Sequence, residues 1–186
     1  MHWYKGLSRR EFIRLGAVAA AASGFSSCAN PKIPWRFLTL AEARTLAALC
    51  DQIIPPDNDP GAQWASVVNY IDIQLCGPYT DLQSVYRDGL AALDKFSTTK
   101  FGHDFASLAA DTQLTLLKSI DLATTSPEKT IAAAQQSFFH LVIDHTMQGF
   151  YGDPRHGGNR EGTSWRMLGI PYPPIRGRLH YDVNQR

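Results

Sequence analysis

The chain lacks the features that mark several large classes of protein. Its 18 basic and 17 acidic residues nearly cancel, and it has no long basic run that could follow a nucleic-acid backbone. Charged residues make up only 19% of the chain and hydrophobic residues 44%, which excludes a disordered tail. Its 186 residues leave room for one domain with a sizeable core. We therefore expect a single folded domain that does not bind nucleic acid.

Cysteine and the common catalytic motifs are also scarce or missing. Three cysteines stand at positions 28, 50 and 76, too few for a zinc cluster, and no Cys-x-x-Cys-His sequence is present for haem attachment. The chain has no Gly-x-Gly-x-x-Gly or Gly-Lys-Ser/Thr phosphate loop and no Gly-x-Ser-x-Gly elbow. No nucleophile has a base at motif spacing. The sequence therefore predicts a chain that is not catalytic by itself and holds no cofactor or metal.

Residues 1–27 are predicted to be an export segment. Ser8-Arg9-Arg10-Glu11-Phe12 precedes a short alanine-rich stretch, Leu15 to Ala22. This stretch is too short to span a membrane, which takes about 20 apolar residues. Paired arginines followed by phenylalanine resemble a twin-arginine signal, which exports folded proteins in bacteria. We expect Ser8, Arg9, Arg10 and Phe12 to form the signal of a periplasmic protein.

The end of this segment has two interpretations. Gly24-Phe25-Ser26-Ser27-Cys28 resembles a lipoprotein cleavage box, although its phenylalanine is atypical there. Lipidation of Cys28 would hold the protein at the inner membrane as a peripheral protein. Cleavage near Ala20 to Ala22 would instead leave Cys28 in the mature N-terminus. In both cases we expect the folded domain over residues 28–186.

Cys50 and Cys76 also allow two interpretations. The oxidising periplasm permits a disulfide between them, which would close a loop of about 26 residues and stabilise the fold by about 3–4 kcal/mol. The alternative is two buried thiols that pack as small apolar side chains. Export to the periplasm favours the disulfide.

Helical periodicity runs through most of residues 39–150. A capping box, Thr39-Leu40-Ala41-Glu42, and apolar residues three and four apart predict a first helix that Pro55-Pro56 ends. Pro55 to Gly61 has the composition of a surface loop. Similar patterns predict four further helices: over 67–75, from Asp81 to a polar patch at Ser97-Thr98-Thr99, from about Asp111 to Leu122, and from Ser126-Pro127-Glu128 to about Phe150.

No alternating strand pattern is present, so the expected fold class is all-α, an irregular domain of about five helices. Apolar residues are spread widely around the last helix, which predicts burial on more than one side. After Phe150 the sequence is rich in glycine, arginine and aromatic residues and has little helix propensity. The backbone of such a segment needs hydrogen-bond partners. We therefore expect residues 149–186 to form an extended tail that another protein completes.

Titratable side chains near the end of the last helix suggest an alternative. His140 and His145 point about 140° apart on a helix, whereas metal ligands on one helix stand three or four residues apart. His140 and Asp144 do share a face, so a metal or acid–base site there stays open. The alternative is a stand-alone periplasmic metal-binding or enzymatic protein that uses His140, Asp144, His145 and His156. Asp153 is predicted to start a turn and to pair with Arg155 or Arg160.

A set of motifs along almost the whole chain resembles a known family. The set comprises the twin-arginine start, Leu49 to Pro55 with Pro60-Gly61-Ala62, Tyr86-Arg87-Asp88-Gly89-Leu90, Phe101-Gly102 with Phe105, Gly149-Phe150-Tyr151-Gly152-Asp153-Pro154 through Gly157-Gly158-Asn159, and Trp165-Arg166-Met167-Leu168-Gly169. The last two are long and unusual enough to be specific. The set resembles the gluconate 2-dehydrogenase subunit 3 family, the small gamma subunits of membrane-bound flavin-dependent sugar and polyol dehydrogenases.

The resemblance implies a role in a complex. In that family a large flavoprotein of the glucose-methanol-choline (GMC) type holds FAD and oxidises the sugar, and a multihaem cytochrome c commonly carries electrons onward. The resemblance implies no haem in this chain. It implies that the small subunit binds the FAD-loaded flavoprotein, stabilises it, and escorts it folded through the twin-arginine (Tat) export machinery. The sugar stays open among gluconate, glucose, fructose, sorbitol and others.

On this basis we expect the tail from Gly149 to Pro174 to lie along the large subunit. Phe150, Tyr151 and Trp165 are the predicted buried anchors, and Arg155 and Arg160 are the predicted polar contacts. The other predicted partner-binding residues are Asp153, Pro154, Gly157, Gly158 and Asn159. A membrane lipoprotein scaffold with a different partner is a further alternative.

Overall fold

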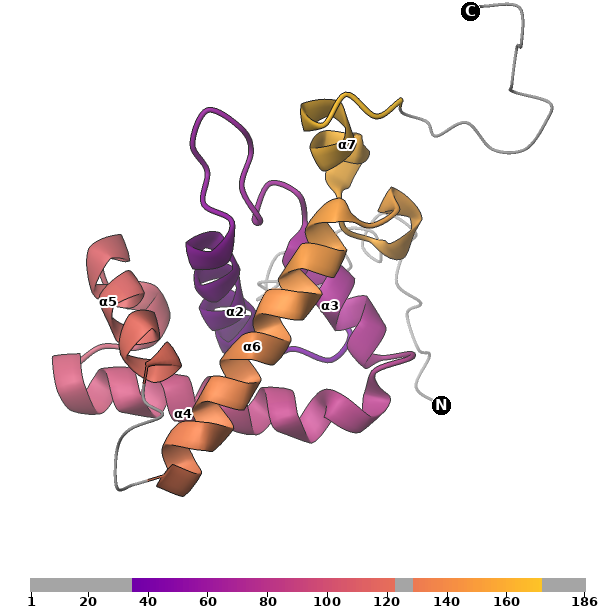
Figure 1. Cartoon of the computed structure of the whole chain (residues 1–186). Helices are drawn as coiled ribbons and strands as arrows, with labels where there is room; N and C mark the ends of the chain where they lie inside the picture. The colour runs from indigo at the N-terminus through magenta and orange to yellow at the C-terminus, as the bar shows by residue number, and fades with distance from the viewer. Residues whose placement is uncertain (1–34, 123–128, 172–186) are drawn as a thin grey trace, which may run out of the picture. The chain divides into compact units, whose positions relative to one another are not determined.

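The computed structural model describes residues 35–122 and 129–171 (Figure 1). Within these ranges the chain is helical and has no strand, which confirms the all-α fold class. The α-helices are α2 (Leu40–Ile53), α3 (Val67–Leu75), α4 (Gln83–Phe101), α5 (Ala110–Asp121), α6 (Lys129–Tyr151) and α7 (Thr163–Met167). Short 3₁₀ helices are η1 (Thr80–Leu82), η2 (Phe105–Ser107), η4 (Pro154–His156) and η5 (Arg160–Gly162). The predicted export segment, Cys28, the predicted cap at Ser126 and the chain after Pro171 lie outside the described residues.

The start of α2 confirms the predicted capping box. The Thr39 hydroxyl accepts a hydrogen bond from the Glu42 backbone N–H at 3.2 Å, and the Glu42 carboxylate accepts one from the Thr39 N–H at 2.7 Å. These bonds satisfy N–H groups that the first turn of a helix leaves without partners. The helix ends at Ile53, directly before the proline-rich loop, and Pro55 to Pro60 are exposed as predicted.

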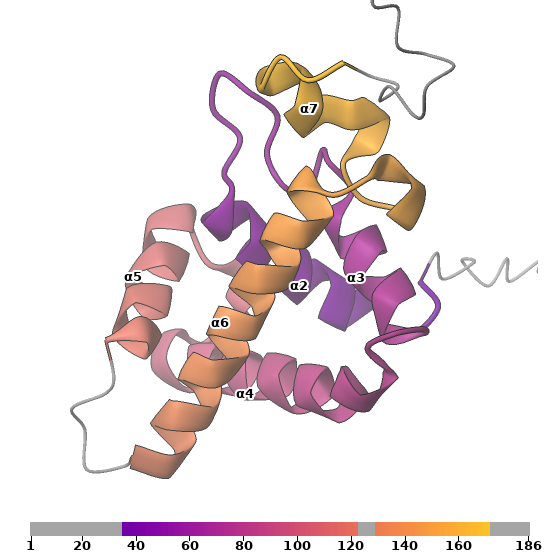
Figure 2. The same ribbon diagram turned by 45° about the vertical axis from the view of Figure 1, so that its right-hand side comes forward.

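The long helix α6 packs against α2, α3, α4 and α5 (Figures 1 and 2). Phe138, Val142 and Phe150 on α6 are buried among core side chains of the other helices, such as Leu46, Tyr86 and Leu90. The buried positions form one broad face, whereas His140, Asp144 and Met147 on the opposite side are exposed, so the predicted burial on more than one side was wrong. Because apolar burial is the main force that holds such a domain together, α6 is its central element.

Helix α4 is longer than predicted. It continues past Ser97 and Thr99 to Phe101, and Gly102 ends it with a backbone φ of +79°. The Ser97 and Thr99 hydroxyls donate hydrogen bonds to the carbonyls of Leu93 and Lys95, at 2.9 and 2.8 Å. These bonds to carbonyls four residues earlier let the polar residues stay within the helix. The predicted end at the polar patch was therefore wrong.

The predicted disulfide between Cys50 and Cys76 is not formed. Both cysteines are free, with Cys50 buried in α2 and Cys76 exposed at the end of α3. The Cys50 sulfur accepts a hydrogen bond from the Thr146 hydroxyl on α6 at 3.3 Å. Burial raises the pKa of the Cys50 thiol to about 12, so it stays protonated and packs as a small apolar group.

Candidate functional site

Two segments far apart in the sequence meet beyond the C-terminal end of α2. The Arg160 N–H donates a hydrogen bond to the Ala65 carbonyl at 3.1 Å, and the Arg160 guanidinium lies 5.1 Å from the centre of the Trp64 ring. Between them and the loop after α2 lies a groove of about 690 Å³. We call it the Trp64 groove; its lining residues are Asp51, Pro56, Asp57, Asn58, Asp59, Pro60, Gly61, Gln63, Trp64 and Arg160.

The loop that forms one wall of this groove is closed by hydrogen bonds within itself. The Asp59 N–H donates to the Asp57 carboxylate at 2.9 Å, and the Ala62 N–H donates to the Ile54 carbonyl at 2.9 Å. A Cβ atom at Gly61 would lie 2.6 Å from the backbone nitrogen of Pro56 and 2.8 Å from the Ile54 carbonyl oxygen. The close approach of these backbone segments therefore requires glycine at position 61.

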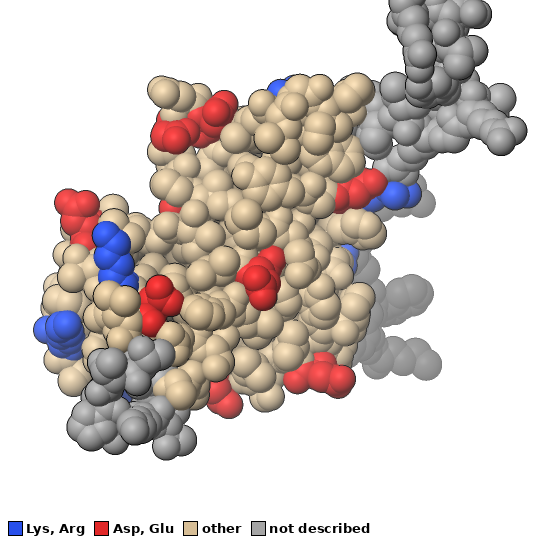
Figure 3. Space-filling view, in the orientation of Figure 1, with Lys and Arg blue, Asp and Glu red and all other residues tan. Residues whose placement is uncertain are grey.

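Three carboxylates give the Trp64 groove an acidic lining. Asp57 and Asp59 are exposed on the loop, and Figure 3 shows acidic side chains at the tip of this loop (upper left). The Asp51 carboxylate accepts a hydrogen bond from the Gln63 N–H at 2.9 Å. Burial raises the pKa of Asp51 above its usual value, and this hydrogen bond partly opposes the effect. The Trp64 side chain is 51% exposed, so the groove combines negative charge with an accessible aromatic surface.

The segment after α6, predicted as an extended tail, is folded over residues 152–170. Asn159 is fully buried; its N–H donates to the Gly149 carbonyl, its side-chain amide donates to the Gly152 carbonyl, and its side-chain oxygen accepts from the Ser164 N–H, at 2.8, 2.8 and 2.9 Å. One asparagine thus supplies the backbone partners that we expected from another protein. This part of the tail is completed by its own chain.

Several predicted partner-binding residues serve this fold instead. Phe150 is buried in the core, so it is not available as an anchor for another protein. A Cβ atom at Gly158 would collide with the Gly149 carbonyl, and one at Gly157 would lie 2.5 Å from the Ile73 side chain. The glycine pair therefore permits close packing on α3 and α6.

Asp153 and Pro154 start a turn, as predicted. The Asp153 carboxylate accepts hydrogen bonds from the Arg155 backbone N–H at 3.0 Å and from its side chain at 3.1 and 3.0 Å. This arrangement confirms the predicted ion pair with Arg155. Arg160, by contrast, lies over Trp64.

Exposed apolar side chains surround α7. The Trp165 indole N–H donates to the Tyr151 carbonyl at 2.8 Å, which fixes α7 on the end of α6. Tyr151, Met167, Leu168 and Ile170 are exposed. We call these four side chains the α7 surface. Of these, only Tyr151 was among the predicted partner-binding residues.

Trp64 was not among the predicted site residues. Its position shortly after a proline- and aspartate-rich loop is a sequence signal that could have indicated an exposed aromatic side chain. Its significance depends on Arg160, which stands almost a hundred positions later in the chain and reaches Trp64 only through the fold. Sequence spacing therefore could not reveal the pair.

The four side chains of the alternative metal or acid–base site do not come together. His140 pairs with the Asp121 carboxylate at 2.8 Å on an exposed face. His145 is buried between the rings of Tyr79 and Tyr86, and its Nδ1 lies 2.8 Å from the Tyr86 hydroxyl. Burial lowers the pKa of His145, which the Asp144 carboxylate partly opposes. Asp144 and His156 are exposed, and in the described ranges no group of three His, Cys, Asp or Glu residues is arranged to hold a metal.

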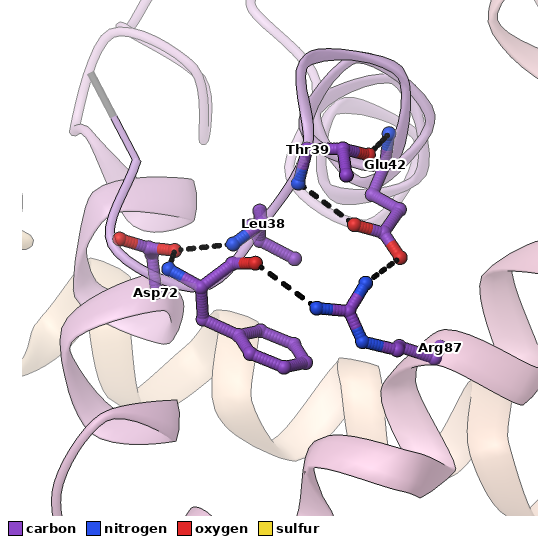
Figure 4. Close-up of polar contacts among 6 residues, drawn as sticks. Leu38, Thr39, Glu42, Asp72 and Arg87 are labelled. Atoms are coloured by element: carbon purple, nitrogen blue, oxygen red, sulfur yellow. Dashed lines mark hydrogen bonds and ion pairs between the residues drawn. The ribbon is translucent and has the colours of Figure 1, made fainter. Parts of the chain in front are cut away.

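At the N-terminal end of α2 a buried carboxylate holds the incoming chain (Figure 4). Asp72 on α3 is 1% exposed and accepts hydrogen bonds from the backbone N–H groups of Arg36, Phe37 and Leu38, at 2.7, 3.0 and 2.9 Å. We call this arrangement the Asp72 clamp. Its signal in the sequence is the single aspartate within the apolar stripe of α3.

Arg87 of α4 reinforces the same region. Its guanidinium donates to the Glu42 carboxylate at 2.9 Å and to the Phe37 carbonyl at 3.4 Å, and lies 4.3 Å from the centre of the Phe37 ring. Side chains of α2, α3 and α4 therefore hold residues 36–38 in place directly before α2.

Comparison with known proteins adds one finding. A family model described as gluconate 2-dehydrogenase subunit 3 matches residues 41–171, which is well over half of the chain. No curated protein and no solved structure matched the chain. Among the described helices, none combines the length and the apolar character that crossing a membrane requires.

Proposed function

Because the chain belongs to the gluconate 2-dehydrogenase subunit 3 family, we propose that it binds the large flavoprotein subunit of a dehydrogenase complex and escorts it through twin-arginine export. The observation that carries this proposal is the family match over residues 41–171, which spans the domain from α2 past α7. Membership makes the chain an accessory subunit of the gluconate 2-dehydrogenase type. The escort role follows from the twin-arginine sequence at Arg9-Arg10, which precedes the domain.

The two ends of α2 suit two different parts of this role, one structural and one in partner binding. The Asp72 clamp holds residues 36–38, directly before α2, against α3. The Trp64 groove and the α7 surface leave aromatic and apolar side chains exposed for a partner. Exposed aromatic side chains are typical of protein interfaces.

The redox chemistry in this proposal belongs to other subunits. FAD sits in the large GMC-type flavoprotein, which also selects the sugar, and haem c sits in a cytochrome subunit. The small subunit acts by binding: a partner that binds only the folded flavoprotein stabilises it by mass action. We place the complex at the periplasmic face of the inner membrane, with lipidation of Cys28 as an additional attachment.

Co-purification tests this proposal. The chain is tagged at its C-terminus, expressed with its native neighbouring genes, and purified from the periplasm and membrane while the visible spectrum is recorded. We expect a yellow, stoichiometric large partner in the exported fraction. The double substitution Arg9→Lys with Arg10→Lys should leave both proteins in the cytoplasm. A colourless chain that is exported alone would contradict the proposal.

A further inference from the structure

We propose that the Trp64 groove receives a cationic side chain, carried by an apolar segment of the large flavoprotein. This inference rests on the proposed function and names the surface and the chemistry of the contact. Three observations support the inference: the shape of the groove, the exposure of Trp64 and the charge of the lining residues.

The groove is formed before any partner arrives. The contacts of Asp57 with Asp59, of Ala62 with Ile54 and of Gln63 with Asp51 fix the loop wall, and Gly61 permits its close packing. On the other side, the hydrogen bond from Arg160 to Ala65 fixes the C-terminal wall. A preformed site loses little conformational entropy on binding, which favours affinity.

Trp64 offers the type of surface that anchors protein interfaces. Trp64 is 51% exposed, and the Arg160 guanidinium lies over its ring. Tryptophan and arginine are enriched among the few residues that carry most of the binding energy of an interface. Pro56 and Pro60 add apolar surface to the same groove.

The negative charge of the groove indicates that the partner side chain is positively charged. Asp51, Asp57 and Asp59 line it, and none of the three takes part in the ion pairs found among residues 35–122 and 129–171. The Arg160 guanidinium is directed at the Trp64 ring. A lysine or arginine of the partner would complement these carboxylates, and apolar residues beside it would cover Trp64.

The position of the groove favours a large partner over an isolated ligand. It lies at the same end of the domain as the α7 surface, as Figures 1 and 2 show for the loop after α2 and for α7. A stable interface takes about 800 Å² from each partner, which the groove alone does not provide. We therefore assign the groove as the anchor point and the α7 surface as its apolar extension.

Affinity measurements on the full complex test this inference. The tagged chain is titrated with its FAD-loaded large subunit at several salt concentrations, for the wild type, Trp64→Ala, and Asp57→Asn with Asp59→Asn. We expect Trp64→Ala to weaken binding about 30-fold or more. The double aspartate variant should weaken binding about fivefold at low salt and flatten its salt dependence.

Two matched controls separate the groove from general surface effects. Phe96→Ala removes an exposed aromatic side chain of α4, and Asp81→Asn with Asp88→Asn removes two exposed carboxylates, all outside the groove. We expect both controls to bind within about twofold of the wild type. Thermal unfolding by circular dichroism verifies that each variant is folded.

Each outcome decides the inference. If the wild type binds and both groove variants bind equally well, the groove assignment is wrong and the proposed function stands. If the wild type binds no flavoprotein, the proposed function fails and the inference with it. If sedimentation shows a dimer of this chain that Trp64→Ala dissociates, the occupant is a second copy, which also overturns the inference.

Discussion

Acidic side chains near the two ends of α2 are in opposite situations. At the N-terminal end, the buried Asp72 carboxylate accepts three backbone hydrogen bonds from residues 36–38. About 20 Å away along the helix, at the C-terminal end, Asp51, Asp57 and Asp59 line an accessible groove beside an exposed tryptophan. The hydrogen-bonding capacity of the first site is used within the chain, whereas the charge of the second is available to a partner.

In one small domain, a buried carboxylate that stabilises the fold is thus separate from the exposed carboxylates to which we assign binding. A buried charge without partners is costly, so Asp72 is useful only while its three N–H donors stay in place. Exposed charges contribute little to folding, so Asp57 and Asp59 can serve recognition at low cost to stability. Substitutions at the two ends should therefore affect different measurements.

The largest expected effect is that of Asp72→Ala. The substitution leaves three N–H groups without their acceptor and releases residues 36–38, so we expect the free energy of unfolding to fall by about 3 kcal/mol. Urea unfolding of the purified chain measures it. Asp88→Ala, which removes an exposed carboxylate on α4, is the control and should change stability by less than about 0.5 kcal/mol. Equal effects of the two variants would show that the clamp does not stabilise the fold.

At the other end of α2, Gly61→Ala should have the next largest effect. Its Cβ atom would lie 2.6 Å from the Pro56 nitrogen, so the loop wall of the groove must shift. We expect a loss of about 1–3 kcal/mol in unfolding free energy, together with weaker flavoprotein binding. Gly77→Ala is a matched control, because its Cβ atom would lie 3.6 Å from its nearest neighbour, an ordinary contact. Equal effects of the two alanines would show that the loop after α2 does not need the close packing at Gly61.

His145 gives a pH probe of the core, independent of both ends. Burial lowers its pKa in the folded state below the usual value of about 6.5. The unfolded chain therefore binds a proton at higher pH than the folded chain, and the free energy of unfolding should fall as pH drops below about 6.5. His145→Gln should remove this part of the pH dependence, as measured by urea unfolding between pH 7 and pH 5. An unchanged pH profile in the variant would assign the dependence to another group.

The smallest effect is expected for Asp51→Asn. Burial raises the pKa of Asp51, so its charge costs the folded state some stability relative to the unfolded chain, and asparagine keeps an oxygen for the Gln63 N–H. Solvent screening at this partly exposed site limits the change in unfolding free energy at pH 7 to less than about 0.5 kcal/mol. Asp72→Asn should be clearly destabilising in the same urea series. A similar loss in both variants would remove the distinction between the two ends.

The parts of the fold that local patterns encode could be predicted from the sequence. The capping box at Thr39, the prolines after Ile53 and the apolar periodicity gave α2, α3 and α5 close to their observed bounds. The end of α4 could not be predicted in this way, because Ser97 and Thr99 bond to carbonyls within the helix. Gly89, an unusual residue within a helix, is explained by Phe138 of α6, with which a Cβ atom there would collide.

The candidate site depended on contacts between distant residues, and the sequence predicted less of it. Asn159 folds the segment after α6 through bonds to Gly149 and Gly152, so glycines that suggested an extended tail instead permit compact turns. Trp64 gains its role from Arg160, and Asp72 gains its role from residues 36–38. Each pairing joins elements that only the three-dimensional fold brings together.

The most direct test of the account compares Trp64→Ala with Asp72→Ala in both stability and flavoprotein affinity, measured on the same preparations. We expect Trp64→Ala to lower the free energy of unfolding by only about 1 kcal/mol, clearly less than Asp72→Ala, while its affinity falls about 30-fold. Asp72→Ala should lose stability and, at temperatures where it remains folded, bind within about threefold of the wild type. Full affinity in Trp64→Ala, or a loss of affinity in Asp72→Ala as large as that expected for Trp64→Ala, would contradict the separation of the two ends.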